Sequence, residues 1–255
     1  MAATARFKVL AVIPARLKST RFPGKVIAPL DGKPLVAHTY ARTVQAELVT
    51  ETVVATDDET VAEALRPYDI PVVMTRSDHP SGTDRIAEVA ENSDAQIVVN
   101  VQGDEPLIEP KIIDDTIRPL LQQRTVQMAT ARRRLTRPED IHNPNIVKVV
   151  CDRKGHALYF SRCPIPCIRD AADQSVAQSC YWQHIGIYVY RRNFLLRYAK
   201  MAPTPLERLE KLEQLRVLEN GFSIAVVESQ YVSLGVDSPE DLERVRAILE
   251  SAGKD

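Results

Sequence analysis

The sequence predicts an α/β protein whose mixed, mostly parallel sheet lies between layers of helices. In the first half of the chain, apolar runs alternate with stretches of helical spacing about every 20 to 30 residues, a pattern typical of parallel sheets. One apolar run, residues 98–101, passes directly into Gln102, Gly103, Asp104 and Glu105, which indicates a buried strand that ends in an acidic turn. The 255 residues are 44% hydrophobic, so one large domain can form a core without metals or disulfides.

The elements of the first half follow from the spacing of apolar residues. Phe7–Ile13 predicts a buried strand, and Lys33–Val49 places apolar residues on one side of a helix. Ser81 and Asp84 fit a capping box that begins a helix, and Pro119 is expected to kink or end the helix that opens at Glu109. Further strands are predicted at Thr52–Ala55, Pro71–Met74 and Ala95–Val101, and further helices up to Leu65 and over Ile86–Ala90.

The second half predicts mostly strands, which makes the sheet mixed. Leu206–Leu218 is predicted to be one charged amphipathic helix that stops at Asn220 and Gly221. Ser238 begins the final helix as its cap, and the polar stretch Asp170–Ser179 is expected to be a mobile loop. Strands are predicted at Val126–Arg133, Ile146–Cys151, His156–Phe160, His184–Tyr190 and Ser223–Val227.

The charge balance argues against two classes of partner. The formal net charge is −1, so no general basic field would recruit nucleic acid or an anionic membrane surface. The N-terminus lacks the apolar run of a secretory signal, and no apolar stretch approaches the roughly 20 residues of a membrane helix. We therefore expect a cytoplasmic protein with reduced thiols and with neither a nucleic-acid nor a membrane partner.

The cysteines leave one metal alternative open. Cys163 and Cys167, followed by Cys180 and His184, have a spacing that resembles a zinc site, which would make the chain a zinc-binding protein. Two prolines stiffen the first cysteine pair and the flanking sequence indicates strands, which favours semi-buried thiols instead.

The loop after the first strand, residues 14–25, predicts a polyphosphate site. It holds Arg16, Lys18, Arg21 and Lys25 beside a glycine and two hydroxyls. Arginine binds phosphate oxygens in pairs and lysine adds a point charge, whereas the alternative is a solvated basic loop. Neither a Walker A loop nor a dinucleotide-binding glycine motif occurs, which argues against P-loop ATPases and nicotinamide dehydrogenases.

Asp104 is the first candidate for a metal ligand. It follows a predicted parallel strand, and open α/β sheets bind nucleotides at the carboxyl ends of such strands. Mg²⁺ prefers oxygen ligands, so a carboxylate in this position predicts a magnesium site. Gly103 would let the backbone approach a ligand closely; the alternative is that Gly103 and Asp104 form only a turn.

Several motifs together resemble one enzyme family. Residues 13–25 match the pattern I-P-A-R-x-x-S-T-R-x-P-G-K of nucleotidyltransferases. With residues 81–83 (Ser-Gly-Thr), 159–162 (Tyr-Phe-Ser-Arg) and 212–216 (Leu-Glu-Gln-Leu-Arg), in the family's order over nearly the whole chain, the sequence resembles the 3-deoxy-manno-octulosonate (Kdo) cytidylyltransferases. The resemblance implies a three-layer α/β fold like that of nucleotide-diphospho-sugar transferases. It also implies a single domain over residues 1–255, with a smaller lobe, roughly residues 125–215, for sugar binding and dimer contacts.

The resemblance implies a reaction and its partners. CMP would pass from CTP to the anomeric oxygen of Kdo, an acidic keto-sugar, giving CMP-Kdo and pyrophosphate for lipopolysaccharide biosynthesis. The implied cofactor is Mg²⁺ and the implied assembly is a homodimer. The sugar-pocket residues are too few to exclude a cytidylyltransferase for sialic acid or for an 8-amino analogue of Kdo.

The resemblance also implies roles for individual residues. Arg21, Lys25, Asp104 and Asp237 would be catalytic, with both aspartates binding the metal; by itself, Asp237 would be taken only to favour a helix N-terminus. The implied nucleotide-binding residues are Arg16, Ser19, Arg21, Lys25, Arg76, Ser81 and Gln102. The implied sugar-binding residues are Gln102, Arg162, His184, Tyr188, Glu213 and Gln214.

Simpler roles stay open for some of these residues. Ser81 could be only a helix cap, His184 a core histidine, and Glu213 and Gln214 part of a solvated helix face. The chain departs from the family at Cys167, where an aromatic residue is expected after Ile-Pro, so that segment is assigned no role.

Overall fold

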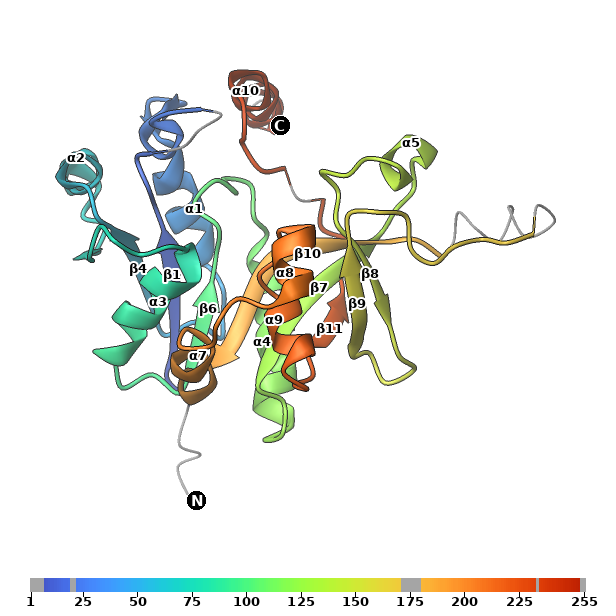
Figure 1. Cartoon of the computed structure of the whole chain (residues 1–255). Helices are drawn as coiled ribbons and strands as arrows, with labels where there is room; N and C mark the ends of the chain where they lie inside the picture. The colour runs from blue at the N-terminus through green and yellow to red at the C-terminus, as the bar shows by residue number, and fades with distance from the viewer. Residues whose placement is uncertain (1–6, 19–21, 171–179, 233, 253–255) are drawn as a thin grey trace, which may run out of the picture.

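A nine-stranded sheet forms the centre of the protein (Figure 1). The computed structural model describes residues 7–18, 22–170, 180–232 and 234–252. The strands are β1 (Val9–Pro14), β4 (Glu51–Thr56), β5 (Val72–Met74), β6 (Ile97–Asn100), β7 (Met128–Arg134), β8 (Lys148–Cys151), β9 (Ala157–Ser161), β10 (Trp182–Arg191) and β11 (Ala225–Glu228), and β2 (Pro29–Leu30) pairs with β3 (Lys33–Pro34) in a separate hairpin.

The strand order is β11-β7-β10-β6-β1-β4-β5, and β8 and β9 extend the sheet from β10. β6, β1, β4 and β5 pair in parallel, as do β11 and β7, whereas β10 runs antiparallel to both of its neighbours on this path. The prediction of a mostly parallel, mixed sheet is confirmed. Each of the nine predicted strands is present, with ends shifted by at most two residues.

Helices cover both faces of the sheet. They are α1 (Leu35–Thr43), α2 (Glu59–Leu65), α3 (Gly82–Glu91), α4 (Pro110–Gln122), α5 (Pro138–Ile141), α7 (Arg192–Tyr198), α8 (Pro205–Glu210), α9 (Leu215–Glu219) and α10 (Pro239–Ala252), with short 3-10 turns η1 (Lys25–Ile27) and η2 (Arg66–Tyr68).

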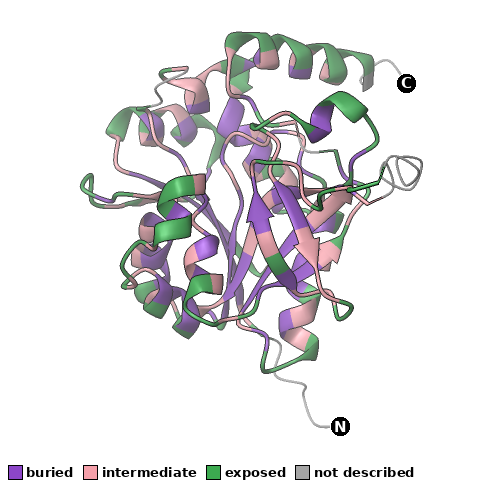
Figure 2. Ribbon diagram, turned by 45° about the vertical axis from the view of Figure 1, so that its right-hand side comes forward, coloured by how far each residue is buried: buried purple, intermediate pink, exposed green. Residues whose placement is uncertain are grey.

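The alternation of side chains along β1 creates the layers. Val9, Ala11 and Ile13 join a core cluster with residues of α1, α2 and α4, whereas Leu10 and Val12 join a second cluster with α3, α7 and α9. Figure 2 shows the buried strands between helices whose outer sides are exposed. The three-layer prediction is therefore confirmed.

The predicted helix over Leu206–Leu218 is wrong. It is two short helices, α8 and α9, which are separated at Lys211, where φ is 55°. The leucines do not form one apolar stripe: Leu209 is 80% exposed, whereas Leu212 and Leu215 are buried. The chain must change direction after α8 to bury Leu212 and Leu215, and it does so at Lys211, whose backbone adopts the left-handed conformation.

Two other helix ends differ from the prediction. α1 ends at Thr43 rather than near Val49, because the backbone N–H groups of Glu47 and Leu48 bind the Asp114 carboxylate at 3.0 and 2.8 Å in place of helical carbonyls. α4 continues beyond Pro119 to Gln122 while its apolar face remains buried. The capping box at Ser81 and Asp84 and the cap of α10 by Ser238 are confirmed.

The predicted lobe over residues 125–215 includes β7 and β10, which belong to the central sheet, and α5, β8 and β9, which extend to the right of it in Figure 1. Its role stays a prediction. Of the predicted mobile loop, residues 171–179 lie outside the described part of the chain. Within the described ranges, none of the helices has both the length and the apolar character that a membrane crossing requires.

Candidate active site

Two loops meet at the carboxyl ends of β1 and β6. Gly103 lies against the end of β1, where a Cβ atom would come within 2.7 Å of the Pro14 carbonyl oxygen. This contact gives a structural reason for the glycine, and Gly103 also lines the cleft described below, so the expected close approach to a ligand stays a prediction. Only glycine lets the acidic turn pack this tightly against the basic loop.

Lys25 joins the two predicted metal ligands. Its Nζ donates to Asp104 Oδ2 at 2.6 Å, to Asp237 Oδ1 at 2.9 Å and to the Val236 carbonyl at 3.0 Å. The Asp104 and Asp237 side chains are 28% and 43% exposed, so both carboxylates remain accessible from the cleft. Ser19 and Arg21, predicted for the same site, lie outside the described residues.

The electrostatic balance keeps Lys25 charged. Burial alone would lower the pKa of Lys25, but the charges of Asp104 and Asp237 and their hydrogen bonds raise its pKa above the usual range. The oxygens of Asp104 and Asp237 thus converge on a single cation, the Lys25 ammonium group.

This trio lies in a hollow that we call the cationic cleft. Arg16 also contributes: its Nη2 donates to the His79 carbonyl at 3.2 Å, and its buried Nε has no hydrogen-bond partner among the described residues. Lys18, which the sequence did not assign, lines the same cleft. The cationic cleft is lined by Pro14, Arg16, Lys18, Lys25, Val26, Gly82, Gln102, Gly103, Asp104 and Asp237.

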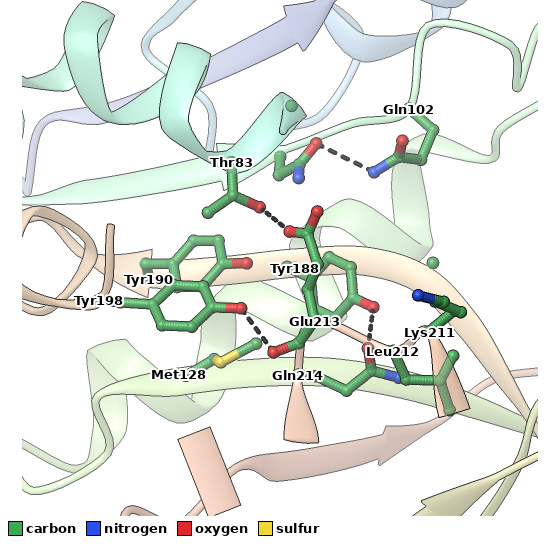
Figure 3. Close-up of a pocket in the computed structure, with 13 residues that line it drawn as sticks. Thr83, Gln102, Met128, Tyr188, Tyr190, Tyr198, Lys211, Leu212, Glu213 and Gln214 are labelled. Atoms are coloured by element: carbon green, nitrogen blue, oxygen red, sulfur yellow. Dashed lines mark hydrogen bonds between the residues drawn. The ribbon is translucent and has the colours of Figure 1, made fainter. Parts of the chain in front are cut away.

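A second hollow, the tyrosine cavity, adjoins the cleft (Figure 3). Its volume is about 280 Å³, which suits one small ligand. The two hollows share Gly82 and Gln102, so a molecule in one lies next to a molecule in the other. The cavity is lined by Gly82, Thr83, Asn100, Gln102, Met128, Gly186, Tyr188, Tyr190, Tyr198, Lys211, Leu212, Glu213 and Gln214.

Hydrogen bonds hold the polar side chains of the tyrosine cavity in place. Thr83 Oγ1 donates to Glu213 Oε2 at 2.7 Å, and Tyr188 donates to Gln214 Oε1 at 3.2 Å (Figure 3). Tyr198 donates to the Glu213 backbone carbonyl at 2.7 Å. The buried Nε2 of Gln214 has no hydrogen-bond partner within the described chain, so this donor is available to a ligand acceptor.

Burial also controls charge in the cavity. It raises the pKa of Glu213 above its usual range, although the hydrogen bond from Thr83 opposes this. It raises the pKa of Tyr188 as well, so the phenol remains a donor. The cavity therefore offers neutral donors, together with a carboxyl group that protonates more readily than usual.

Four of the six predicted sugar-binding residues share one cavity, and their roles stay predictions. Gln102, Tyr188, Glu213 and Gln214 line the tyrosine cavity. The open alternative that Glu213 and Gln214 form a solvated helix face is wrong, because both lie in the turn between α8 and α9 and Gln214 is 2% exposed.

Arg162 and His184 do not line the cavity. Arg162 donates to the carbonyls of Pro144, Glu210 and Lys211 at 2.9, 2.7 and 3.3 Å, which ties three chain segments together. His184 is buried, its Nε2 lies 2.9 Å from the Thr130 hydroxyl, and burial lowers its pKa to about 3. A neutral core histidine, the simpler alternative, fits this position better than a partner for a carboxylate.

Two nucleotide predictions also fall outside the cleft. Arg76 lies in a separate hollow, where its 69% exposed side chain is 3.5 Å from Asp78. Ser81 caps α3 through the Asp84 backbone N–H at 3.2 Å, while the next two residues line the tyrosine cavity. Roles for Arg76 and Ser81 in binding stay predictions.

The zinc alternative gains no support. Cys163 and Cys167 are exposed, whereas His184 is committed to Thr130 in the core. Across the described residues, no group of three or more His, Cys, Asp or Glu side chains could hold a metal ion.

The cavity contains residues that sequence reasoning missed. Thr83 is the last residue of the Ser-Gly-Thr motif at residues 81–83, and its place two residues after the cap was a usable signal. Tyr190 lies two residues after Tyr188 in β10, on the same face of the strand, and could have been inferred from the strand period. Tyr198 and Lys211 carried no local signal, because α7 and the break at Lys211 were not predicted.

Comparisons with known proteins point to one family. The sequence matches the family described as "Cytidylyltransferase" over residues 10–227. A relative from Geobacter metallireducens named 3-deoxy-manno-octulosonate cytidylyltransferase is 56% identical over 245 residues, 93% of this chain and 96% of the relative. A relative of the same name from Solibacter usitatus is 53% identical over 245 residues and covers 96% of each chain.

Solved structures agree with these relatives. A structure described as CMP:2-keto-3-deoxy-manno-octonic acid synthetase complexed with CTP matches with a TM-score of 0.90 at 39% identity, over 96% of this chain and 99% of that one. A 4-diphosphocytidyl-2C-methyl-D-erythritol synthase from Anaerococcus prevotii, at 12% identity and a TM-score of 0.62 over 96% and 99% of the two chains, shows the fold alone. The chain belongs to the 3-deoxy-manno-octulosonate cytidylyltransferase family.

Proposed function

We propose that this protein transfers CMP from CTP to the anomeric oxygen of Kdo and releases pyrophosphate. The observation that carries the proposal is the meeting of Lys25, Asp104 and Asp237 in a cationic cleft that shares Gly82 and Gln102 with the tyrosine cavity. The relatives named above and the neighbour solved with CTP support the same substrates. The alternatives, sialic acid and an 8-amino analogue, are not favoured.

The hollows suggest how the substrates divide the site. We assign the triphosphate to the cationic cleft and the sugar to the tyrosine cavity. A third hollow shares Arg16 and Lys18 with the cleft and is also lined by Asp57 and His79, so we assign the cytosine to it. The sugar oxygen would then attack the α-phosphorus where cleft and cavity join.

The residues of the chain supply positioning and charge. Arg16, Lys18 and Lys25 would neutralise the phosphate oxygens and favour departure of pyrophosphate. Gln214 would donate to the sugar through its free amide hydrogens, and Glu213 would bind a hydroxyl. Lys211 is the only cation among the described cavity residues, so it, rather than Arg162 or His184, would meet the sugar carboxylate.

We propose Mg²⁺ as the cofactor, held by Asp104 and Asp237. Their fit rests on the two carboxylate oxygens, which approach one Nζ atom to 2.6 and 2.9 Å, and on a donor set of hard oxygens. Bound there, Mg²⁺ would neutralise negative charge on the substrate phosphates. Two carboxylates suffice for this ion because substrate oxygens and water complete its shell.

Pyrophosphate release from CTP tests the proposal. With Mg²⁺ present, Kdo should support faster turnover than sialic acid or the 8-amino analogue, and Asp104→Asn should abolish turnover while the protein remains folded. Asp94→Asn is the matched control, because Asp94 is 79% exposed in a surface ion pair with Lys8. Preference for another sugar would overturn the substrate, and turnover by Asp104→Asn at the parent rate would overturn the metal assignment.

We further propose that the enzyme is a cytoplasmic homodimer whose product serves lipopolysaccharide biosynthesis. Family membership supports the assignment, and Leu158 in β9, within the predicted lobe, is 62% exposed and available for a protein contact. Light scattering should give twice the mass of one 28.5 kDa chain, and a single-chain mass would contradict the dimer.

A further inference from the structure

Asp237 reaches the site by a long crossing. It follows β11, which lies at one end of the sheet, whereas Asp104 follows β6; β7 and β10 separate these two strands. In Figure 1 the chain leaves β11 and rises to α10 at the top of the view. The separation of the two acids therefore depends on contacts that fix the described residues of this crossing segment, 229–232 and 234–237.

Described residues of the segment contact the acidic turn at two points. Near its start, the Tyr231 hydroxyl donates to Glu105 Oε2 at 2.9 Å. Near its end, the Val236 N–H donates to the Asp104 carbonyl at 2.9 Å. Between them, Gly235 passes beside Glu105, since a Cβ there would lie 3.7 Å from Glu105 Oε1.

Tyr231 is suited to fix the distance between the crossing segment and the acidic turn. Its side chain belongs to the larger core cluster and is 4% exposed, and its backbone N–H donates to Ser229 Oγ at 3.0 Å. Burial and the adjacent Glu105 carboxylate raise the pKa of Tyr231, so its hydroxyl remains a donor. A rigid ring anchored in the core thus binds the residue directly after Asp104.

We propose that Tyr231 is a positioning residue, and that its hydrogen bond to Glu105 fixes Asp104 and Asp237 at the separation that a divalent cation needs. The inference rests on the proposed function. Contacts that orient metal ligands typically change metal affinity or activity by about 10- to 100-fold when they are removed. Tyr231 itself lines neither the cationic cleft nor the tyrosine cavity.

Mn²⁺ binding in the presence of CTP, measured from the spin resonance of free Mn²⁺, tests the inference independently of turnover. Tyr231→Phe should bind Mn²⁺ about tenfold more weakly and have a lower kcat, with KM for the sugar unchanged. Glu105→Ala should match it. Glu105→Gln should stay within about twofold of the parent, because the amide oxygen still accepts the hydrogen bond.

The matched control is Tyr68→Phe, which removes a hydroxyl that donates to the Gly32 carbonyl at 3.2 Å. It should leave Mn²⁺ affinity unchanged. Parent-like Mn²⁺ affinity in Tyr231→Phe would overturn the inference alone, as would a Glu105→Gln variant that loses as much as Glu105→Ala. If Tyr231→Phe does not fold, the two Glu105 variants decide. Failure of the parent to bind Mn²⁺ with CTP would overturn the metal assignment and this inference together.

Discussion

At the scale of single residues, Lys25 determines the charge of the site. Two carboxylates that share a site repel each other, and the ammonium between Asp104 and Asp237 offsets this repulsion. Lys25 is buried more fully than either acid, with 12% of its side chain exposed. Because Asp104 and Asp237 keep 28% and 43% of their side chains exposed to water, the principal effect of Lys25 should be on ligand binding and catalysis, rather than on the stability of the fold.

Lys25→Met should lower kcat/KM for CTP by about 100-fold, the usual effect of losing one donor to developing negative charge. The free energy of unfolding should change little, because both carboxylates can reach water. Lys33→Met is the control, since Lys33 is exposed. Steady-state kinetics with varied CTP give the result, and an unchanged kcat and KM would contradict the role.

His184 makes stability depend on pH. Burial lowers its pKa to about 3, from 6.5 in an ordinary environment. Between these values the unfolded chain binds a proton that the folded chain does not, so the contribution of neutral His184 is complete above pH 6.5 and is lost as the pH falls through this window.

His184→Gln should weaken this dependence. A pKa difference changes stability by about 1.4 kcal/mol per pH unit, so between pH 7 and pH 5 the parent should lose about 2 kcal/mol more than the variant. Urea unfolding at both pH values measures the difference. Identical pH dependence in parent and variant would show that His184 is not buried as a neutral group.

At the scale of elements, the α8–α9 hairpin presents Glu213 and Gln214 to the tyrosine cavity. The side chain of Glu207 in α8 accepts from Arg216 Nε at 2.8 Å and from the Thr204 backbone N–H at 3.0 Å. Both members of the Glu207–Arg216 pair are nearly buried, with 9% and 12% of their side chains exposed. The pair closes the hairpin around the turn that carries the two cavity residues.

Glu207→Ala should destabilise the protein by about 3 kcal/mol, because it leaves the Arg216 charge buried without its partner. It should also raise KM for the sugar, since the turn is no longer held. Glu243→Ala is the matched control: its pair with Arg246 is exposed, at 65% and 34%, and should contribute less than about 1 kcal/mol. Chemical denaturation and sugar kinetics test both changes; equal effects of the two variants would contradict the assignment.

At the scale of the whole molecule, an early segment of the chain and its last helix, α10, pack together near the site. A small core cluster joins Leu30 and Leu35, near the basic loop, to Leu242 and Val245 of α10. It is separate from the two clusters that sandwich the central sheet. Because Asp237 lies only two residues before the start of α10, docking of this helix on the cluster helps to hold Asp237 in the cleft.

Leu242→Ala should loosen α10 without unfolding the sheet. Truncation of a buried leucine costs about 2–5 kcal/mol, and here the loss falls on the small cluster. Activity should fall by about tenfold or more, while the main thermal transition moves by only a few degrees. Ile248→Ala, at a 37% exposed position of the same helix, is the control. If the variant instead lost the whole fold in one cooperative transition, the small cluster would not be separable from the central sheet.

Local patterns identified the strands and helix caps because both signals are short in range. Alternation along β1 and β6 reports burial on two faces, and the Ser81–Asp84 and Ser238–Asp241 caps involve residues three apart. Helix lengths were less predictable, because distant groups such as the Asp114 carboxylate compete with helical carbonyls for the backbone N–H groups.

The sequence by itself determined the layered α/β fold, the basic loop and the place of Asp104, since each depends on residue type and on position relative to a strand end, whereas Asp237 was singled out only by the resemblance to a known family. Only the tertiary structure decided which side chains line the tyrosine cavity. Lys211 and Tyr198 enter it whereas Arg162 and His184 do not, because a left-handed turn, the burial of Leu212 and Leu215, and hydrogen bonds between distant segments determine where those side chains point.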